Sequence, residues 1–232
     1  MIQPQIDLLL QWAAPQVDEL LRGREEYFAG TGGEVHEDDR CYEQRMQAFF
    51  NWFLFDRRQA DGATPVERFL REKGAELAAK DKDILLGCTQ SRLGLYEYRG
   101  TRGGLFSRPA RGQVRVRDLV TGESFDVTER RQMHGLEVGD LFEARLVPLG
   151  RTWHFSTSFT YQPREVYGAI RREIKRRKKQ GAVDARALAW ELERMGLQHE
   201  RFRNVSIDAI YNFETPFLSR KQRPGEAQQR GG

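Results

Sequence analysis

The chain has 232 residues, of which 39% are hydrophobic, 11% aromatic and 31% charged, so it can bury an ordinary globular core and is neither fibrous nor broadly disordered. Its 38 basic and 34 acidic residues give a formal net charge of +4 at pH 7, which excludes a generally basic protein. No stretch reaches the ~20 apolar residues of a membrane span and the opening residues lack a secretory pattern, so we expect a cytoplasmic protein without a membrane partner.

The first 90 residues read as a helical module. Apolar residues recur there at steps of three and four, and Pro15 predicts a break between two short helices. A glycine-punctuated acidic stretch follows at 30–39. The next segment, 41–56, is so dense in aromatic residues that a helix here is apolar nearly all round, which is typical of a helix central to a core.

A capping box predicts the start of another helix. Thr64 is the expected N-cap, Pro65 occupies the first helical position and Glu67 follows three residues after the cap. Further apolar residues predict one or two more helices, which end near Gln90.

Residues 91–162 predict a small β domain, because the apolar period changes from about 3.6 to 2 near Leu93. The alternating segments are 95–98, 114–119, 125–128, 142–146 and 153–156. Five short strands without helices between them predict a small antiparallel barrel, either SH3-like or OB-like. Residues 100–112 are expected to form a longer mobile loop.

Helices return in residues 163–218. Gly181 is the expected C-terminal cap of the first helix, and Asp184 is the expected N-cap of a second helix that closes at Gly196. A third short helix is expected from Ser206. The tail, 219–232, has no apolar anchor and is expected to be disordered. The sequence therefore predicts an α+β protein.

Five motifs carry a resemblance to a known family. They are FFNWFLFDR (49–57), TPVERFL (64–70), SRLGLYEY (91–98), VRDLVTGESFDV (116–127) and GDLFEARLVPLG (139–150). In this order they resemble a family of uncharacterised bacterial proteins that pair an aromatic helical half with a small β domain. Some of those proteins end in a zinc-binding tail of the SEC-C type. This chain has no cysteine beyond Cys88, so that implication is not carried over, and the resemblance implies no activity.

The strongest functional signal is the basic segment 164–180. It holds eight basic residues and two acidic ones, a local charge of +6, whereas the whole chain carries only +4. The residues expected to contact nucleic-acid phosphates are Arg171, Arg172, Lys175, Arg176, Arg177, Lys178 and Lys179. The alternative is a solvated helix end, because the helix dipole favours cations near a C-terminus. The leading hypothesis is a non-enzymatic protein that binds RNA or non-specific DNA.

Aromatic residues of the β domain lie near arginines in the sequence, a combination that stacks and neutralises single strands in small barrels. The aromatic residues are Tyr96, Tyr98, Phe106, Trp153, Phe155, Phe159 and Tyr161. The alternative is that they fill the barrel core, which their alternation favours.

The other functions considered rest on weaker patterns. A protein-interaction adaptor would use an apolar groove of the helical half and dock the basic helix on an acidic partner. A metal-dependent nuclease would use Asp126, Glu143 and Arg145 on neighbouring strands, a pattern that the wet face of a strand also produces. A helix-turn-helix would use 184–195 and 206–213. Cys41 and Cys88 lie far apart without metal-ligand spacing, and the acidic stretch around His36 is typical of a solvated loop, so no metal or cofactor is expected.

Overall fold

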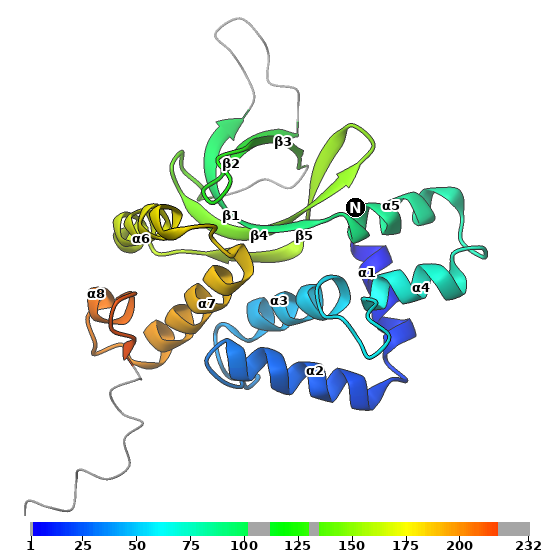
Figure 1. The fold of residues 1–232 in the computed structure, drawn as a ribbon, viewed down its shortest axis with the longest axis horizontal. Coiled ribbons are helices and arrows are strands. Elements are labelled where there is room, and N and C mark those ends of the chain that lie inside the picture. Colours follow the sequence, from blue (N-terminus) through cyan, green and yellow to red (C-terminus); the bar gives the residue numbers. More distant parts are fainter. Residues whose placement is uncertain (1, 102–111, 130–134, 218–232) are drawn as a thin grey trace, which may run out of the picture.

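The computed structural model describes residues 2–101, 112–129 and 135–217 (Figure 1). Within them, eight α-helices and one five-stranded sheet form a mixed α+β protein, as the sequence predicts. The expected mobile loop at 100–112 lies mostly outside the described residues, and the expected disordered tail at 219–232 lies wholly outside them. In the described part of the chain, no helix combines the length and the apolar character needed to cross a membrane.

The helices before the sheet follow the predicted segments. They are α1 (Gln3–Ala13), α2 (Val17–Gly30), α3 (Tyr42–Phe55), α4 (Pro65–Lys73) and α5 (Ala79–Thr89). The predicted break at Pro15 separates α1 from α2. The predicted capping box is confirmed at α4, where the Thr64 side chain accepts from the backbone N–H of Glu67 and the Glu67 carboxylate accepts from that of Thr64.

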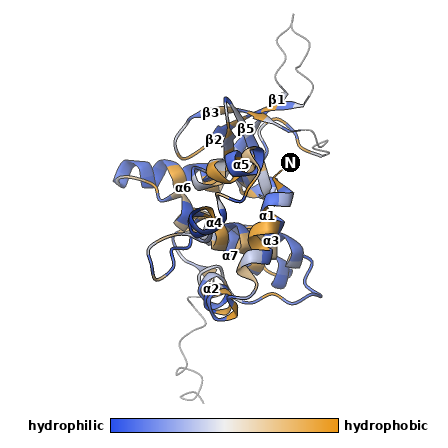
Figure 2. Cartoon of the chain, turned by 90° about the vertical axis from the view of Figure 1, so that its right-hand side faces the viewer, coloured by the Kyte–Doolittle hydropathy of each residue, from blue (hydrophilic) through white to orange (hydrophobic). Residues whose placement is uncertain are grey.

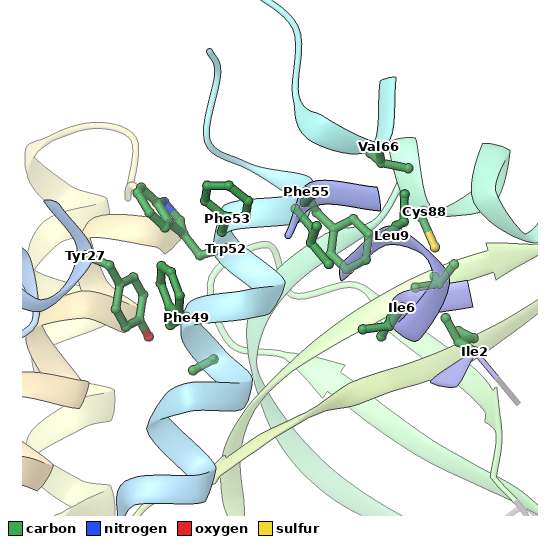
Figure 3. Packing of buried hydrophobic residues seen from close by; sticks show 14 of the residues in the cluster. Ile2, Ile6, Leu9, Tyr27, Phe49, Trp52, Phe53, Phe55, Val66 and Cys88 are labelled. Atoms are coloured by element: carbon green, nitrogen blue, oxygen red, sulfur yellow. The ribbon is translucent and has the colours of Figure 1, made fainter. Parts of the chain in front are cut away.

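Helix α3 is the centre of the largest hydrophobic cluster (Figure 3). Phe49, Trp52 and Phe53 on this helix are buried, and the ring of Tyr27 from α2 lies 5.7 Å from that of Phe49 between centroids. The density of aromatic residues thus has the predicted consequence, because a helix that is apolar on most sides must be covered on most sides.

The sheet contains five strands in the order β1-β2-β3-β5-β4, and it closes because β4 also pairs with β1. The strands are β1 (Arg92–Thr101), β2 (Gln113–Asp118), β3 (Ser124–Thr128), β4 (Leu141–Leu149) and β5 (Thr152–Tyr161). Four of the pairings are antiparallel, whereas β3 and β5 run parallel. The prediction of a fully antiparallel sheet misses this pair, because a parallel contact between distant strands leaves no turn signal in the sequence.

Strand β4 is buried on both faces, and its outward side chains connect the two helical groups. Leu141 packs in the cluster of the C-terminal helices and Val147 in that of the N-terminal helices. Glu143 and Arg145 lie between them on the same outward face and are 3% and 1% exposed. The prediction that these charged residues lie on a wet face is therefore wrong, because helices cover that side of the sheet.

Three helices follow the sheet after a short 3-10 turn, Arg164–Val166. They are α6 (Tyr167–Gln180), α7 (Ala185–Arg201) and α8 (Ile207–Ile210). Gly181, with φ of 146°, ends α6 as predicted, and the Asp184 carboxylate caps α7 by accepting from two backbone N–H groups. The predicted end of α7 at Gly196 is wrong. The helix continues one turn further, since Leu197 and Gln198 are themselves buried by tertiary contacts.

Candidate nucleic-acid interface

Helix α6 lies against the sheet with one apolar side and exposes the rest. Val166 just before it, and Ile170 and Ile174 within it, are buried in one cluster with Leu95 and Leu141 of the sheet. The remaining positions are mainly charged, and Figure 2 shows α6 as hydrophilic along most of its length. The short apolar stripe therefore fixes which cations face solvent.

Two of the seven predicted cations, Arg176 and Arg177, bind carboxylates of the helices α6 and α7. Both donate to Glu173, which lies on the buried side of α6, and Arg177 also donates to Glu191 of α7. The Arg176 hydrogen bond, followed by that of Arg177, keeps the pKa of Glu173 below its ordinary value. Burial alone lowers the pKa of Arg177, but the two carboxylates outweigh it and raise the pKa. Arg177 thus joins α6 to α7.

Two further cations attach α6 to the sheet. Arg171 donates to the Glu97 carboxylate of β1 at 2.9 Å and to the carbonyl oxygen of Gly139 at 3.2 Å. The Lys178 ammonium donates to the carbonyl oxygen of Leu119, just beyond β2, at 3.0 Å. These contacts, about two turns apart, hold the basic half of α6 against the middle of β1 and the end of β2.

Arg172, Lys175 and Lys179 remain exposed and have no hydrogen bond or ion pair to any described residue. At about 100° per residue, these positions lie within about 60° of one another around the helix axis, so they form one row along α6. We call them the basic row. The row faces away from the contacts of Arg177, and its three charges have no partner within 2–101, 112–129 or 135–217.

Strand β2 extends this positive surface. Arg117 is exposed, has no ion pair among the described residues, and lies directly opposite Glu97 in the β1–β2 ladder. Residues opposite each other have Cβ atoms about 4.5–5.5 Å apart and share a face of the sheet. Since Glu97 also binds Arg171, Arg117 lies beside the attachment point of α6. Sequence reasoning considered the arginines of the β domain only together with its aromatic residues and did not connect them with the helix.

The predicted aromatic platform is largely inside the barrel. Tyr96, Tyr98 and Phe155 are buried in the barrel interior, which supports the alternative that these rings form its core. Trp153 and Phe159 are half-buried against the same cluster, and Tyr161 is 52% exposed. Phe106 lies outside the described residues.

The carboxylates considered for a nuclease are not brought together. Asp126 lies on β3 and accepts two hydrogen bonds from Arg115 of β2, whereas Glu143 lies on β4 and is buried. Strands β3 and β4 are not neighbours in the sheet. Among the described residues, no group of three or more His, Cys, Asp and Glu side chains could hold a metal ion. The short α8, with four residues, likewise gives no reading helix of the length proposed for 206–213.

A buried polar cluster joins the sheet to the helices, and sequence reasoning missed it. The Glu143 carboxylate accepts from Gln162 at 2.8 Å, and the Glu193 carboxylate of α7 accepts from the Tyr27 hydroxyl at 2.5 Å. Arg45 of α3 approaches Glu193 to 3.8 Å. Burial raises the pKa of Glu143 well above its ordinary value and Glu193 raises it further, while burial also raises the pKa of Glu193. One sequence pattern could have indicated this cluster: Glu193 lies on the same side of α7 as Ala189, which is buried.

Comparison with known proteins places the chain in a family. The model of DUF7986, a family of unknown function, matches residues 33–189, about two thirds of the chain. The chain belongs to this family. The match confirms the expected resemblance to a family without an established activity. No curated protein and no solved structure matches the chain. The DUF7986 match includes α3 to α6 and the whole sheet, and begins after α2.

Proposed function

We propose that this protein binds single-stranded nucleic acid, RNA or DNA without sequence preference, through phosphate contacts of the basic row. The observation that carries the proposal is that Arg172, Lys175 and Lys179 lie on one exposed face without a partner among the described residues, although the Glu173 carboxylate lies on the same helix. The helix dipole accounts for cations near a C-terminus, but it gives no reason for them to align.

The sheet supports the proposal through its topology. We propose that the barrel is OB-like rather than SH3-like, because its five strands close in the order β1-β2-β3-β5-β4, which is not a simple meander. OB-folds are five-stranded Greek-key barrels that bind oligonucleotides on the face of strands 2 and 3. Arg117 lies on that face here, next to the Glu97 that binds Arg171.

The position of the aromatic side chains limits the kind of recognition. Since most of the β-domain aromatics lie in the barrel core, few rings are available for stacking on bases. Phosphate contacts without base contacts carry no sequence information. We therefore expect an affinity that depends on salt and is similar for different sequences.

The deciding experiment is a titration of a labelled single-stranded RNA followed by fluorescence anisotropy. The triple variant Arg172→Glu, Lys175→Glu and Lys179→Glu is expected to lose binding at low salt. The matched control is Lys80→Glu, Lys82→Glu and Arg151→Glu, which has the same change of net charge at exposed positions away from α6 and is expected to bind like the parent. Equal binding by the basic-row variant and the parent would overturn the proposal.

The second candidate function is a protein-interaction adaptor, and fewer features of the structure support it. Its apolar groove was expected in the helical half, but the aromatic residues of α3 are mainly buried in the core. Val17 and Leu21 on α2 are large apolar residues of that half that are more than half exposed. A protein partner that stays bound after nuclease treatment of the purified complex would favour the adaptor.

A further inference from the structure

A polar groove of about 490 Å³ lies among the helices, and none of the basic-row residues lines it. It is bordered by the end of α3, the N-terminus of α4, the end of α5 and the first turns of α7. Its volume falls within the ~300–1,000 Å³ of common small-molecule sites. We call it the arginine groove, because Arg57, Arg58 and Arg186 line it.

The three guanidinium groups differ in how far they are already occupied. Arg57 is mostly buried and donates to Glu19 and Glu26. Arg58 is 68% exposed, donates to the carbonyl oxygen of Gly62 and forms an ion pair of 3.8 Å with Glu67. Arg186 is 50% exposed, and its contact is an ion pair of 3.6 Å with Asp56, too long for a hydrogen bond. Arg58 and Arg186 therefore keep most of their N–H donors available.

The carboxylates of the groove already accept hydrogen bonds from other groups of the protein. Asp56 accepts from the buried guanidinium of Arg145 behind the groove wall. Glu67 accepts from the backbone N–H of Thr64 in the capping box. Glu26 accepts from Arg57. The acids thus hold the wall together, and the exposed guanidinium groups of Arg58 and Arg186 line the groove.

Two indole rings add further donors without acceptors. Trp52 and Trp190 both line the groove, and neither indole N–H donates a hydrogen bond to any described residue. The Cε3–Cζ3 edge of Trp190 packs against Gly30 of α2, where a Cβ would come within 2.3 Å of the ring. The opposite edge, which carries Nε1–H, therefore points away from α2.

We propose that the arginine groove binds a small phosphate-bearing molecule of nucleotide size. A planar guanidinium group can donate two parallel hydrogen bonds to the oxygens of a phosphate, and an indole N–H is a hydrogen-bond donor and never an acceptor. A wall that presents guanidinium donors from two arginines, with its own carboxylates already hydrogen-bonded, selects an anion rich in acceptor oxygens. The groove is larger than one phosphate needs, so the ligand has an organic part.

The test follows the four indole N–H signals in the ¹H–¹⁵N spectrum of the full chain, since the sequence has Trp12, Trp52, Trp153 and Trp190. Each signal is assigned by a Trp→Phe variant. Addition of adenosine monophosphate is expected to shift the signals of Trp52 and Trp190 and to leave those of Trp12 and Trp153 in place. Adenosine, which lacks the phosphate, is expected to shift none of them at the same concentration.

Variants then identify the anchor. Arg58→Ala and Arg186→Ala are each expected to weaken the binding of adenosine monophosphate at least about tenfold, the loss typical of one hydrogen bond to a charged group. Both side chains are at least half exposed, so their replacement is expected to leave the fold intact. The positions of the Trp12 and Trp153 signals in each variant check this. Arg203→Ala, 58% exposed and remote from the groove, is the matched control and is expected to bind normally.

The outcomes separate this site from the basic row. Retained shifts in the triple variant Arg172→Glu, Lys175→Glu and Lys179→Glu support a separate site. No shift of Trp52 and Trp190 at millimolar adenosine monophosphate overturns the proposal. Shifts that persist unchanged in both Arg58→Ala and Arg186→Ala overturn it as well.

Discussion

The guanidinium of Arg145 on β4 donates a hydrogen bond to the carboxylate of Asp56 at the C-cap of α3. The same guanidinium donates to the Ser91 hydroxyl at 3.0 Å, just before β1. Arg145 is 1% exposed and Asp56 12% exposed, so water screens this pair poorly. The contact connects the sheet with the helical module, and it explains why a charged residue can occupy the centre of a buried strand face.

Replacement of Arg145 should destabilise the fold strongly. In Arg145→Met, Asp56 loses its buried hydrogen-bond donor and keeps only the 3.6 Å ion pair with Arg186, and the loss typical of such a broken buried pair is about 3–5 kcal/mol of unfolding free energy. Urea denaturation will measure it. The control is Arg115→Met, which breaks an exposed arginine–aspartate pair on the same sheet and should cost no more than about 1 kcal/mol. Equal losses in the two variants would contradict the importance of the buried contact.

The stability of the protein should fall as pH rises because of Glu143. Its pKa in the folded state is raised by burial and then by Glu193, so the folded state holds a proton that the unfolded state has released above its ordinary pKa, near 4.5. Between these two pKa values the free energy of unfolding decreases by up to about 1.4 kcal/mol per pH unit.

Glu143→Gln should remove this dependence, because an amide keeps the shape of the protonated acid and has no proton to lose. The midpoint of thermal unfolding, measured from pH 5 to 9, is expected to change less with pH in the variant than in the parent. Towards pH 9 the variant is expected to be the more stable of the two. A parallel pair of profiles would show that Glu143 is not protonated in the folded state.

The dependence of nucleic-acid affinity on salt should report the unpaired cations. We assume that Arg172, Lys175, Lys179 and Arg117 each neutralise one phosphate of a single strand. A plot of the logarithm of the association constant against the logarithm of the salt concentration should then have a slope of about −3. Lys175→Ala should make this slope less steep by about 0.7.

Arg177→Ala is the contrasting variant in the same helix. Because Arg177 donates to Glu173 and Glu191, its loss should lower the unfolding free energy and leave the salt slope close to that of the parent. A change of slope in Arg177→Ala as large as that in Lys175→Ala would contradict the division of these cations into paired and unpaired groups.

The two cysteines should differ in reactivity. Cys88 is buried, and burial raises its pKa to about 12, so very little thiolate forms at neutral pH. Cys41 is partly exposed, and burial raises its pKa less. Alkylation with iodoacetamide, followed by mass spectrometry, is expected to label Cys41 slowly in the folded protein and Cys88 only after unfolding. Labelling of Cys88 at the rate of Cys41 without denaturant would contradict this burial.

Several local features of this fold could be predicted from neighbouring residues alone. The Thr64–Glu67 capping box, the Asp184 cap and the glycine end of α6 each depend on side chains within four positions of one another. The aromatic density of 41–56 likewise implied a central helix. Such features are decided by short-range hydrogen bonds and by the periodicity of apolar residues, so the sequence carries them.

The tertiary structure decided what those local rules do not contain. Charged and apolar residues alternate on β4, and only the packing of helices on its outer face shows that Glu143 and Arg145 are buried. In the same way, the basic segment predicted seven equivalent cations, and their division into attached and free groups depended on Glu97, Glu191 and the Leu119 carbonyl from other elements. The sequence by itself determined the helices, the strands and the charge of α6. Contacts between residues far apart in the chain decided which charges are compensated, because the partner of a charge is set by distance in space.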